Sequence, residues 1–194
     1  MKKIFKKDYF SDFKIFDISE CRKEFPLCRR SRYGELFNSD SKINVFISHK
    51  HNDIEEVKGV IGFLEKTYNV QCYIDELDDD MPDNTNKETA VRIKNKIQMC
   101  DKYILIATNG AILSRWCNWE LGFSDAVKRK CNIAIIHMGM QDDYKGNEYY
   151  ELYPYIAFCE KDSNHDECDY YVIDNDTNEA EKLEIWFRKR LDNE

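Results

Sequence analysis

Two short clusters contain polar side chains that could catalyse a reaction or bind a ligand. In the first, Trp116 and Glu120 are four residues apart, so on a helix they lie on one face. A carboxylate beside an indole suits a reaction that develops positive charge on a sugar, such as glycosidic bond cleavage through an oxocarbenium-like transition state. A surface glutamate next to a core tryptophan is the structural alternative. The residue types alone leave both interpretations open.

The second cluster is the polar run from Ser48 through His49 to Asp53, which directly follows a short apolar segment. It contains neither a dinucleotide-binding glycine fingerprint nor a P-loop. A nucleotide at this place would therefore be held by side chains and by the amides of a helix N-terminus. An ordinary strand-to-helix turn, in which Ser, Asn and Asp cap the helix, explains the same residues.

Metal sites are less well supported than either cluster. The acidic stretch 75–84 lacks the ligand register of an EF-hand loop, and a solvated loop explains it better than a Ca²⁺ or Mg²⁺ site. The histidines at 49 and 51 and the Cys and His residues between 159 and 168 lack a four-ligand zinc spacing. We therefore expect no metal.

Alternating apolar and amphipathic segments position the two clusters. Strands are predicted at 43–47, 70–74, 102–108 and 131–138, with a weaker one at 170–173. Helices are predicted after Asp53 and Thr85, each at the start of a capping box, then from Ser114 to about residue 130, and finally over 183–191. The tyrosine-rich stretch 144–155, which includes Pro154, is predicted to be an irregular loop.

This order predicts an α/β fold in which a parallel sheet has helices on both faces. In such sheets ligands bind beyond the carboxyl ends of the strands. Both clusters fall at that edge.

Composition narrows the functional class. The chain has 194 residues with 29 Lys+Arg against 37 Asp+Glu, which argues against binding nucleic acid through a basic surface. No uncharged run is long enough to span a membrane, and no secretory signal follows Met1. The eight cysteines form no CxxC pair, and several lie in apolar runs. We therefore expect free thiols in a cytoplasmic protein.

Charge also divides the chain. Residues 1–40 carry 10 basic and 7 acidic side chains, whereas the remainder carries 19 and 30. A turn-rich stretch near residue 40 separates the two parts. We therefore predict an N-terminal extension over 1–41 and a domain over 42–194.

Three segments in this order resemble bacterial Toll/interleukin-1 receptor (TIR) domains: VFISHKHND, CYIDELDDDMP and CDKYILIATNGAILSRWCNWELGFSDA. The resemblance covers roughly residues 42–192 and leaves the N-terminal extension outside. It implies a flavodoxin-like, three-layer fold with a five-stranded parallel sheet.

The resemblance also implies cleavage of NAD⁺ at the nicotinamide–ribose bond. By position in the family's motifs, Glu120 is then the catalytic carboxylate and Trp116 its aromatic companion. Ser48 and His49 would contact the substrate, and Asp75 with the loop behind it would close over the ligand. NAD⁺ is in this case a substrate, so no separate cofactor is expected.

TIR proteins of this size resemble the sensor components of Thoeris-type anti-phage systems. That resemblance implies ADP-ribose, or a cyclic or conjugated form of it, as a signal for a separate effector, and self-association through the TIR domain. Two other interpretations stay open: a non-catalytic TIR module for protein–protein contacts, and an enzyme similar to nucleoside deoxyribosyltransferases.

Overall fold

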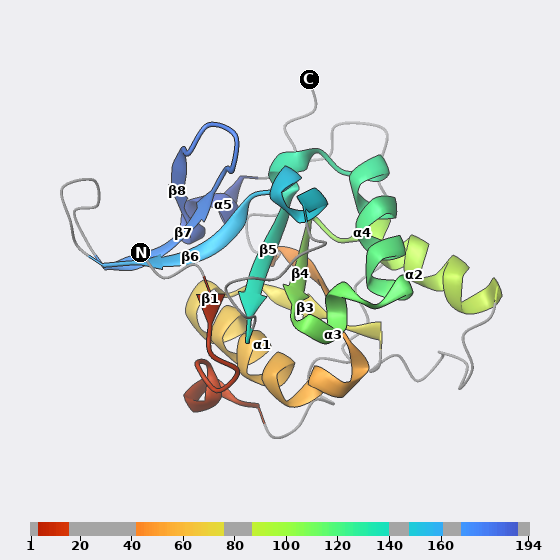
Figure 1. Ribbon diagram of the computed structural model, residues 1–194, viewed down its shortest axis with the longest axis horizontal. Coiled ribbons are helices and arrows are strands. Elements are labelled where there is room, and N and C mark those ends of the chain that lie inside the picture. Colours follow the sequence, from red (N-terminus) through yellow and green to blue (C-terminus); the bar gives the residue numbers. More distant parts are fainter. Residues whose placement is uncertain (1–3, 16–41, 76–86, 140–147, 161–167, 190–194) are drawn as a thin grey trace.

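The apolar runs of the chain assemble into one eight-stranded sheet (Figure 1). The computed structural model describes residues 4–15, 42–75, 87–139, 148–160 and 168–189, and the statements below concern these ranges. None of the helices within them is long and apolar enough to cross a membrane.

Five parallel strands form the centre of the sheet, in the order β3-β2-β4-β5-β6. This is the strand order of flavodoxin-like folds, and it confirms the predicted fold class. The strands are β2 (Asn44–Ser48), β3 (Gln71–Tyr73), β4 (Lys102–Ala107), β5 (Ile133–Met138) and β6 (Tyr155–Cys159).

The fifth parallel strand is not the one that the sequence predicted. Residues 170–173 lie in β7 (Asp169–Ile173), which pairs antiparallel with β6 and is followed by β8 (Ala180–Lys182). The parallel strand is β6, at the end of the stretch predicted to be a loop. Pro154 is compatible with it because it stands just before the strand, where its carbonyl accepts from the Ile135 amide at 2.9 Å.

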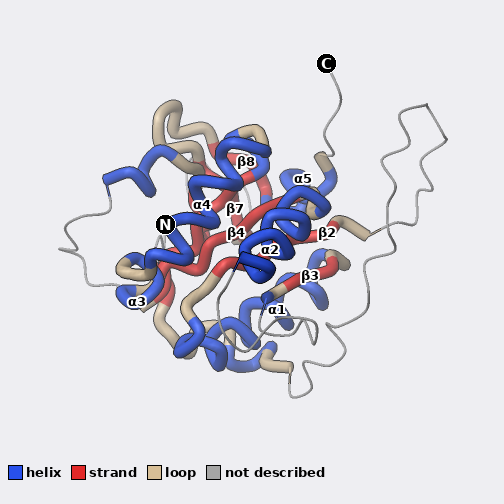
Figure 2. Tube along the Cα trace, turned by 90° about the vertical axis from the view of Figure 1, so that its right-hand side faces the viewer, coloured by secondary structure: helices blue, strands red, loops and turns tan. Residues whose placement is uncertain are grey.

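Helices cover both faces of the sheet (Figure 2). One apolar cluster packs α1 (Ile54–Tyr68) and α5 (Leu183–Arg188) on one face. A second cluster packs α2 (Lys87–Met99), α3 (Asn109–Ile112) and α4 (Arg115–Val127) on the other. The result is the predicted three-layer arrangement, in which both faces of the central strands are buried.

The two-residue period of β2 decides which of its side chains faces which layer. Val45 and Ile47 join the α1 cluster, whereas Phe46 joins the α4 cluster. Ser48, two residues after Phe46, therefore points toward α4 from the carboxyl end of the strand.

The described part of the N-terminal extension packs on the domain. Strand β1 (Ile4–Phe5) pairs in parallel with the end of β5, and the 3-10 helix Ser11–Phe13 packs against α1. Space for β1 exists because β6 pairs with β5 only at Ile135. Residues 16–41 lie outside the described ranges, and the boundary at residue 41 stays a prediction.

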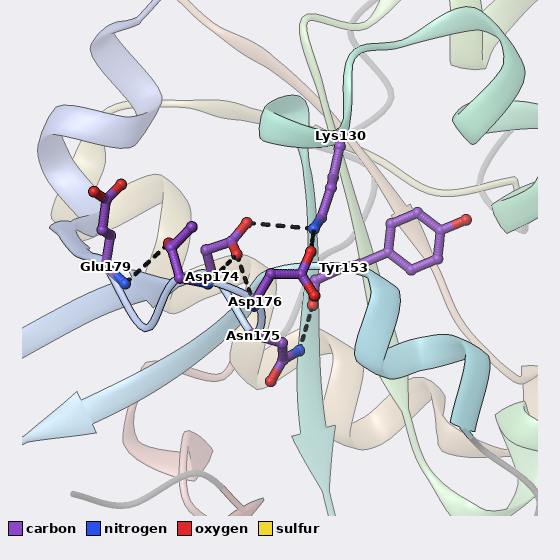
Figure 3. A network of polar contacts seen from close by, with 7 residues as sticks. Lys130, Tyr153, Asp174, Asn175, Asp176 and Glu179 are labelled. Atoms are coloured by element: carbon purple, nitrogen blue, oxygen red, sulfur yellow. Dashed lines mark hydrogen bonds and ion pairs between the residues drawn. The ribbon is translucent and has the colours of Figure 1, made fainter.

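A polar network joins the β7–β8 turn to the residues just before β5 and β6 (Figure 3). It lies at the edge of the sheet where the parallel strands begin. The Lys130 ammonium contacts Asp176 at 2.5 Å and Asp174 at 3.4 Å. The Asn175 amide donates to the Tyr153 carbonyl at 2.7 Å. The antiparallel hairpin is thus fixed at the edge remote from the polar clusters.

At the same edge, Lys102 begins β4 and is buried, with 1% of its surface exposed. Its ammonium donates to Asn132 Oδ1 at 2.6 Å and lies 4.6 Å from the centre of the Trp186 ring. Burial lowers the pKa of Lys102 to about 8, although neighbouring acidic groups oppose the effect. This contact ties α5 to the sheet.

The buried ammonium predicts a pH-dependent stability. A lysine whose pKa falls on folding destabilises the protein below that pKa, and the penalty fades as pH rises toward the pKa of the unfolded chain. The free energy of unfolding of wild type, relative to Lys102→Met, should rise by about 2 kcal/mol between about pH 7.5 and 9.5. Urea unfolding at both pH values measures it. The exposed Lys66→Met variant should show no such change.

Candidate active site

The candidate site lies where the chain connections diverge on either side of β2. From β2 the chain passes through α1 to β3 on one side, whereas β4 is the neighbour on the other side. Such a switch point, at the carboxyl ends of the strands, is the usual ligand site of open α/β sheets. Ser48 ends β2, and Thr108 directly follows β4.

A buried hydrogen bond joins the two sequence clusters. The Ser48 hydroxyl donates to Glu120 Oε2 at 2.5 Å, across 72 residues of sequence. Both residues are buried, with 1% and 2% of their surfaces exposed. Ser114 places the glutamate by capping α4, since its hydroxyl accepts from the Cys117 amide at 3.3 Å, as the sequence predicted. The helix ends at Val127, three residues earlier than expected.

Burial dominates the electrostatics of Glu120. Removal from water raises the pKa of its carboxyl well above the ordinary value, and the negative charge of Asp75 raises it further. The hydrogen bond from Ser48 acts in the opposite direction, because it favours the carboxylate. Asp75, which follows β3, is thus close enough to influence Glu120, whereas 76–86, most of the predicted lid, lie outside the described ranges.

Tyr103 borders the same carboxyl group and was not singled out in the sequence. Its phenol is fully buried, and burial together with the charge of Glu120 raises its pKa well above the ordinary value. Its ring stacks on Phe46, with 5.7 Å between ring centres. Nothing in the sequence signals this role, because a tyrosine within the apolar run of β4 is typical of a core residue.

His49 follows Ser48 and is nearly buried, with 8% of its surface exposed. The Cys117 thiol donates to the His49 carbonyl at 3.2 Å, which joins the end of β2 to α4 a second time. Burial raises the pKa of Cys117 to about 11, so this thiol is a hydrogen-bond donor at neutral pH and not a nucleophile.

Trp116 belongs to a stripe of aromatic rings on α4. Its half-buried indole stacks on Trp119 at 4.9 Å, and Trp119 stacks in turn on Phe123 at 6.1 Å. The sequence placed Trp116 on the helix face of Glu120. Its role as an aromatic wall for a ligand stays a prediction.

A second buried carboxylate lies at the same edge. Asp53 stands at the N-cap of α1, but its side chain makes no capping hydrogen bond, so the predicted capping box is wrong. It accepts instead from the Thr108 hydroxyl at 2.5 Å. The Thr108 oxygen also accepts from the Ala111 amide and so caps α3. In the sequence Asp53 looks like a helix cap and Thr108 like the end of a strand, which conceals their contact across 55 residues.

The described ranges contain no group of three or more His, Cys, Asp or Glu side chains arranged to hold a metal ion. What they do contain is a hydroxyl-bonded, buried carboxyl group at a ligand edge. A carboxyl of this kind can accept hydrogen bonds from a bound ligand, and as a carboxylate it can stabilise a cation.

Comparisons with known proteins agree with this geometry. A family model for the TIR domain matches residues 45–170, from β2 to the first residues of β7. A curated protein of Bacillus cereus (strain MSX-D12), named a probable 3′ cyclic ADP-D-ribose synthase, ThsB′, is 30% identical over 125 residues. The match covers 62% of this chain and 64% of that protein, which is less than two thirds of its length.

Because the Glu120 carboxyl is buried, we expect it to lower the free energy of unfolding at neutral pH. A carboxyl whose pKa rises on folding destabilises the protein progressively as pH increases toward that pKa. Glu120→Gln keeps an acceptor for Ser48 and cannot ionise. It should raise the free energy of unfolding by about 1–2 kcal/mol near pH 8, and by about 0 near pH 4. Urea unfolding measures both, and the exposed Glu88→Gln should change neither.

Proposed function

Since the chain belongs to the TIR domain family, we propose that it cleaves NAD⁺ at the bond between nicotinamide and ribose. The observation that carries the proposal is the buried Glu120 carboxyl, hydrogen-bonded to Ser48 at the switch point of the sheet. Burying a carboxyl this way costs stability, and a pure interaction module has no use for it. The curated relative, named as a cyclic ADP-ribose synthase, supports the same chemistry.

The reaction needs little covalent help from the protein. Nicotinamide leaves as a neutral molecule because the breaking C–N bond returns its electron pair to a cationic pyridinium ring. Positive charge then develops on the ribose, as an oxocarbenium ion. The Glu120 carboxylate would stabilise that charge and accept hydrogen bonds from ribose hydroxyls, while Ser48 orients it. His49, Asp75 and Trp116 would complete the substrate site.

The positive charge of the substrate also favours ionisation of Glu120, which its surroundings oppose. Burial and Asp75 disfavour ionisation of Glu120. A pyridinium cation close to the carboxyl favours the ionised form. Binding of NAD⁺ would therefore lower the pKa of Glu120 and generate the carboxylate where it is needed.

The fate of the cation decides the product. A nucleophile within the same molecule gives a cyclic ADP-ribose, whereas water gives linear ADP-ribose. The name of the Bacillus cereus relative favours the cyclic product. We propose that this product is a signal of Thoeris-type anti-phage defence, made in the cytoplasm by self-associated TIR domains and read by a separate effector. Neither comparison favours a deoxyribosyltransferase.

Glu120→Gln is the direct test of the reaction. Because an amide cannot supply the negative charge, nicotinamide release from NAD⁺ should fall by at least about 100-fold. Release is followed by chromatography, with and without lysate of phage-infected cells to supply a trigger. Glu88→Gln, on the exposed face of α2, should match wild type. Equal release by wild type and Glu120→Gln under both conditions would contradict the assignment.

Asp75→Asn tests whether the carboxylate form is the active one. Asp75 raises the pKa of Glu120, so its removal should lower that pKa. Activity that requires the carboxylate is lost as pH falls through this pKa. The acid limb of the kcat/KM profile should therefore move to lower pH in Asp75→Asn. An acid limb at the wild-type position would show that the charge of Asp75 does not act on the catalytic group.

A further inference from the structure

The proposed substrate contains two phosphate groups, and the site described so far is acidic. Glu120, Asp75 and Asp53 all lie at the edge where the dinucleotide would bind. Phosphates bind to cationic side chains and to backbone amides. The chain has no glycine-rich phosphate loop, so the question is which cation reaches this edge.

Lys7 reaches this edge from residues 4–15, which we call the N-terminal segment. This segment lies outside the part of the chain that matches the TIR family. The Lys7 ammonium lies 3.6 Å from Asp53 and 3.4 Å from Glu56. Its stem crosses Gly139, the residue after β5, so closely that a Cβ at Gly139 would meet Lys7 Cγ at 2.7 Å. Two carboxylates thus fix a lysine over the carboxyl ends of the strands.

This position is built into the fold. The carbonyls of Phe10 and Phe13 lie directly on α1, where a Cβ would approach them to 2.7 Å at Gly59 and to 1.9 Å at Gly62. The ring of Phe10 packs on Phe63 at 4.8 Å between centres. Together with β1, which pairs with β5, these contacts hold the segment on both sides of Lys7.

The residues from Ser48 to Asp53 form a row between Glu120 and Lys7, joined partly by contacts and partly by the chain itself. Ser48 bonds to Glu120, and the next residue, His49, is bonded to α4 through Cys117. Lys50 and Asp53 both border Gly110, at the start of α3, and Asp53 contacts Lys7. A ligand bound along this row would have its sugar at Glu120 and its more distant part near Lys7.

We propose that Lys7 binds the pyrophosphate of the dinucleotide, so that the N-terminal segment forms part of the substrate site. This inference rests on the proposed function. More than half of the Lys7 side-chain surface is exposed, and an ammonium has three donors, so it can contact Asp53, Glu56 and a phosphate oxygen together. The two carboxylates hold the lysine in place.

ADP-ribose and nicotinamide separate the two ends of the ligand, because only ADP-ribose carries the pyrophosphate. In isothermal titration of the full chain, Lys7→Ala should raise the Kd for ADP-ribose about tenfold and leave the Kd for nicotinamide unchanged. Lys7→Arg should stay within about threefold of wild type. In the reaction, Lys7→Ala should raise the KM for NAD⁺ about tenfold with kcat unchanged.

Lys14→Ala is the matched control. Lys14 lies in the same N-terminal segment as Lys7 and pairs with Glu55 of α1, the helix that also carries Glu56. Lys14→Ala therefore also removes one positive charge, but at a position away from the ligand edge. It should bind ADP-ribose like wild type. Gly62→Ala places a methyl group against the Phe13 carbonyl, so it should displace the N-terminal segment from α1 without changing Lys7 itself. It should weaken the binding of ADP-ribose as much as Lys7→Ala does. The double variant should bind no more weakly than either single one.

Four results would overturn the proposal. Lys7→Ala could bind ADP-ribose as tightly as wild type, or Lys14→Ala could lose as much affinity for ADP-ribose as Lys7→Ala does. Lys7→Ala could also lose affinity equally for ADP-ribose and nicotinamide, or wild type could fail to bind ADP-ribose. Failure of the proposed function gives a different pattern. In that case wild type releases no nicotinamide, yet ADP-ribose binding still depends on Lys7, which supports the pyrophosphate contact alone.

Discussion

The hydrogen bond between Ser48 and Glu120 is the contact on which the site depends. An ionisable carboxyl inside the protein is tolerated only if its lone pairs are satisfied and its charge is suppressed or matched. Ser48 supplies the first condition from the end of β2. Burial and Asp75 supply the second by disfavouring ionisation. The exact placement of α4 on the sheet is therefore a chemical requirement and not only a packing preference.

The parallel topology explains how residues far apart in sequence meet. Every central strand ends at the same edge, so the residues after β2 and β4 become neighbours whatever the intervening chain length. Two buried carboxyl–hydroxyl pairs result, Ser48 with Glu120 on the α4 side and Thr108 with Asp53 near α1. The extension adds a third contribution through Lys7. One edge thus gathers groups from the beginning and the middle of the chain.

The sequence predicts those features that depend on local pattern. Apolar runs identified four of the five parallel strands, and Ser114 identified the start of α4. Strand β6 was missed because Pro154 and its tyrosine neighbours have turn-like and surface-like character, although the strand is buried. Asp53 was taken for a cap because its partner, Thr108, is 55 residues away. The position of Lys7 beside Asp53 could not be predicted for the same reason, because contacts between distant residues leave no periodic pattern in the sequence.

The short strand β1 has a consequence for the behaviour of the protein in solution. Because β6 leaves β5 after Ile135, the last residues of β5 would offer unpaired N–H and C=O groups if β1 were absent. An open strand edge is a template for pairing with another chain. Ile4 and Phe5 close it, and the Gly139 amide donates to the Phe5 carbonyl at 2.7 Å. These two residues thus occupy backbone groups of β5 that could otherwise pair with another chain.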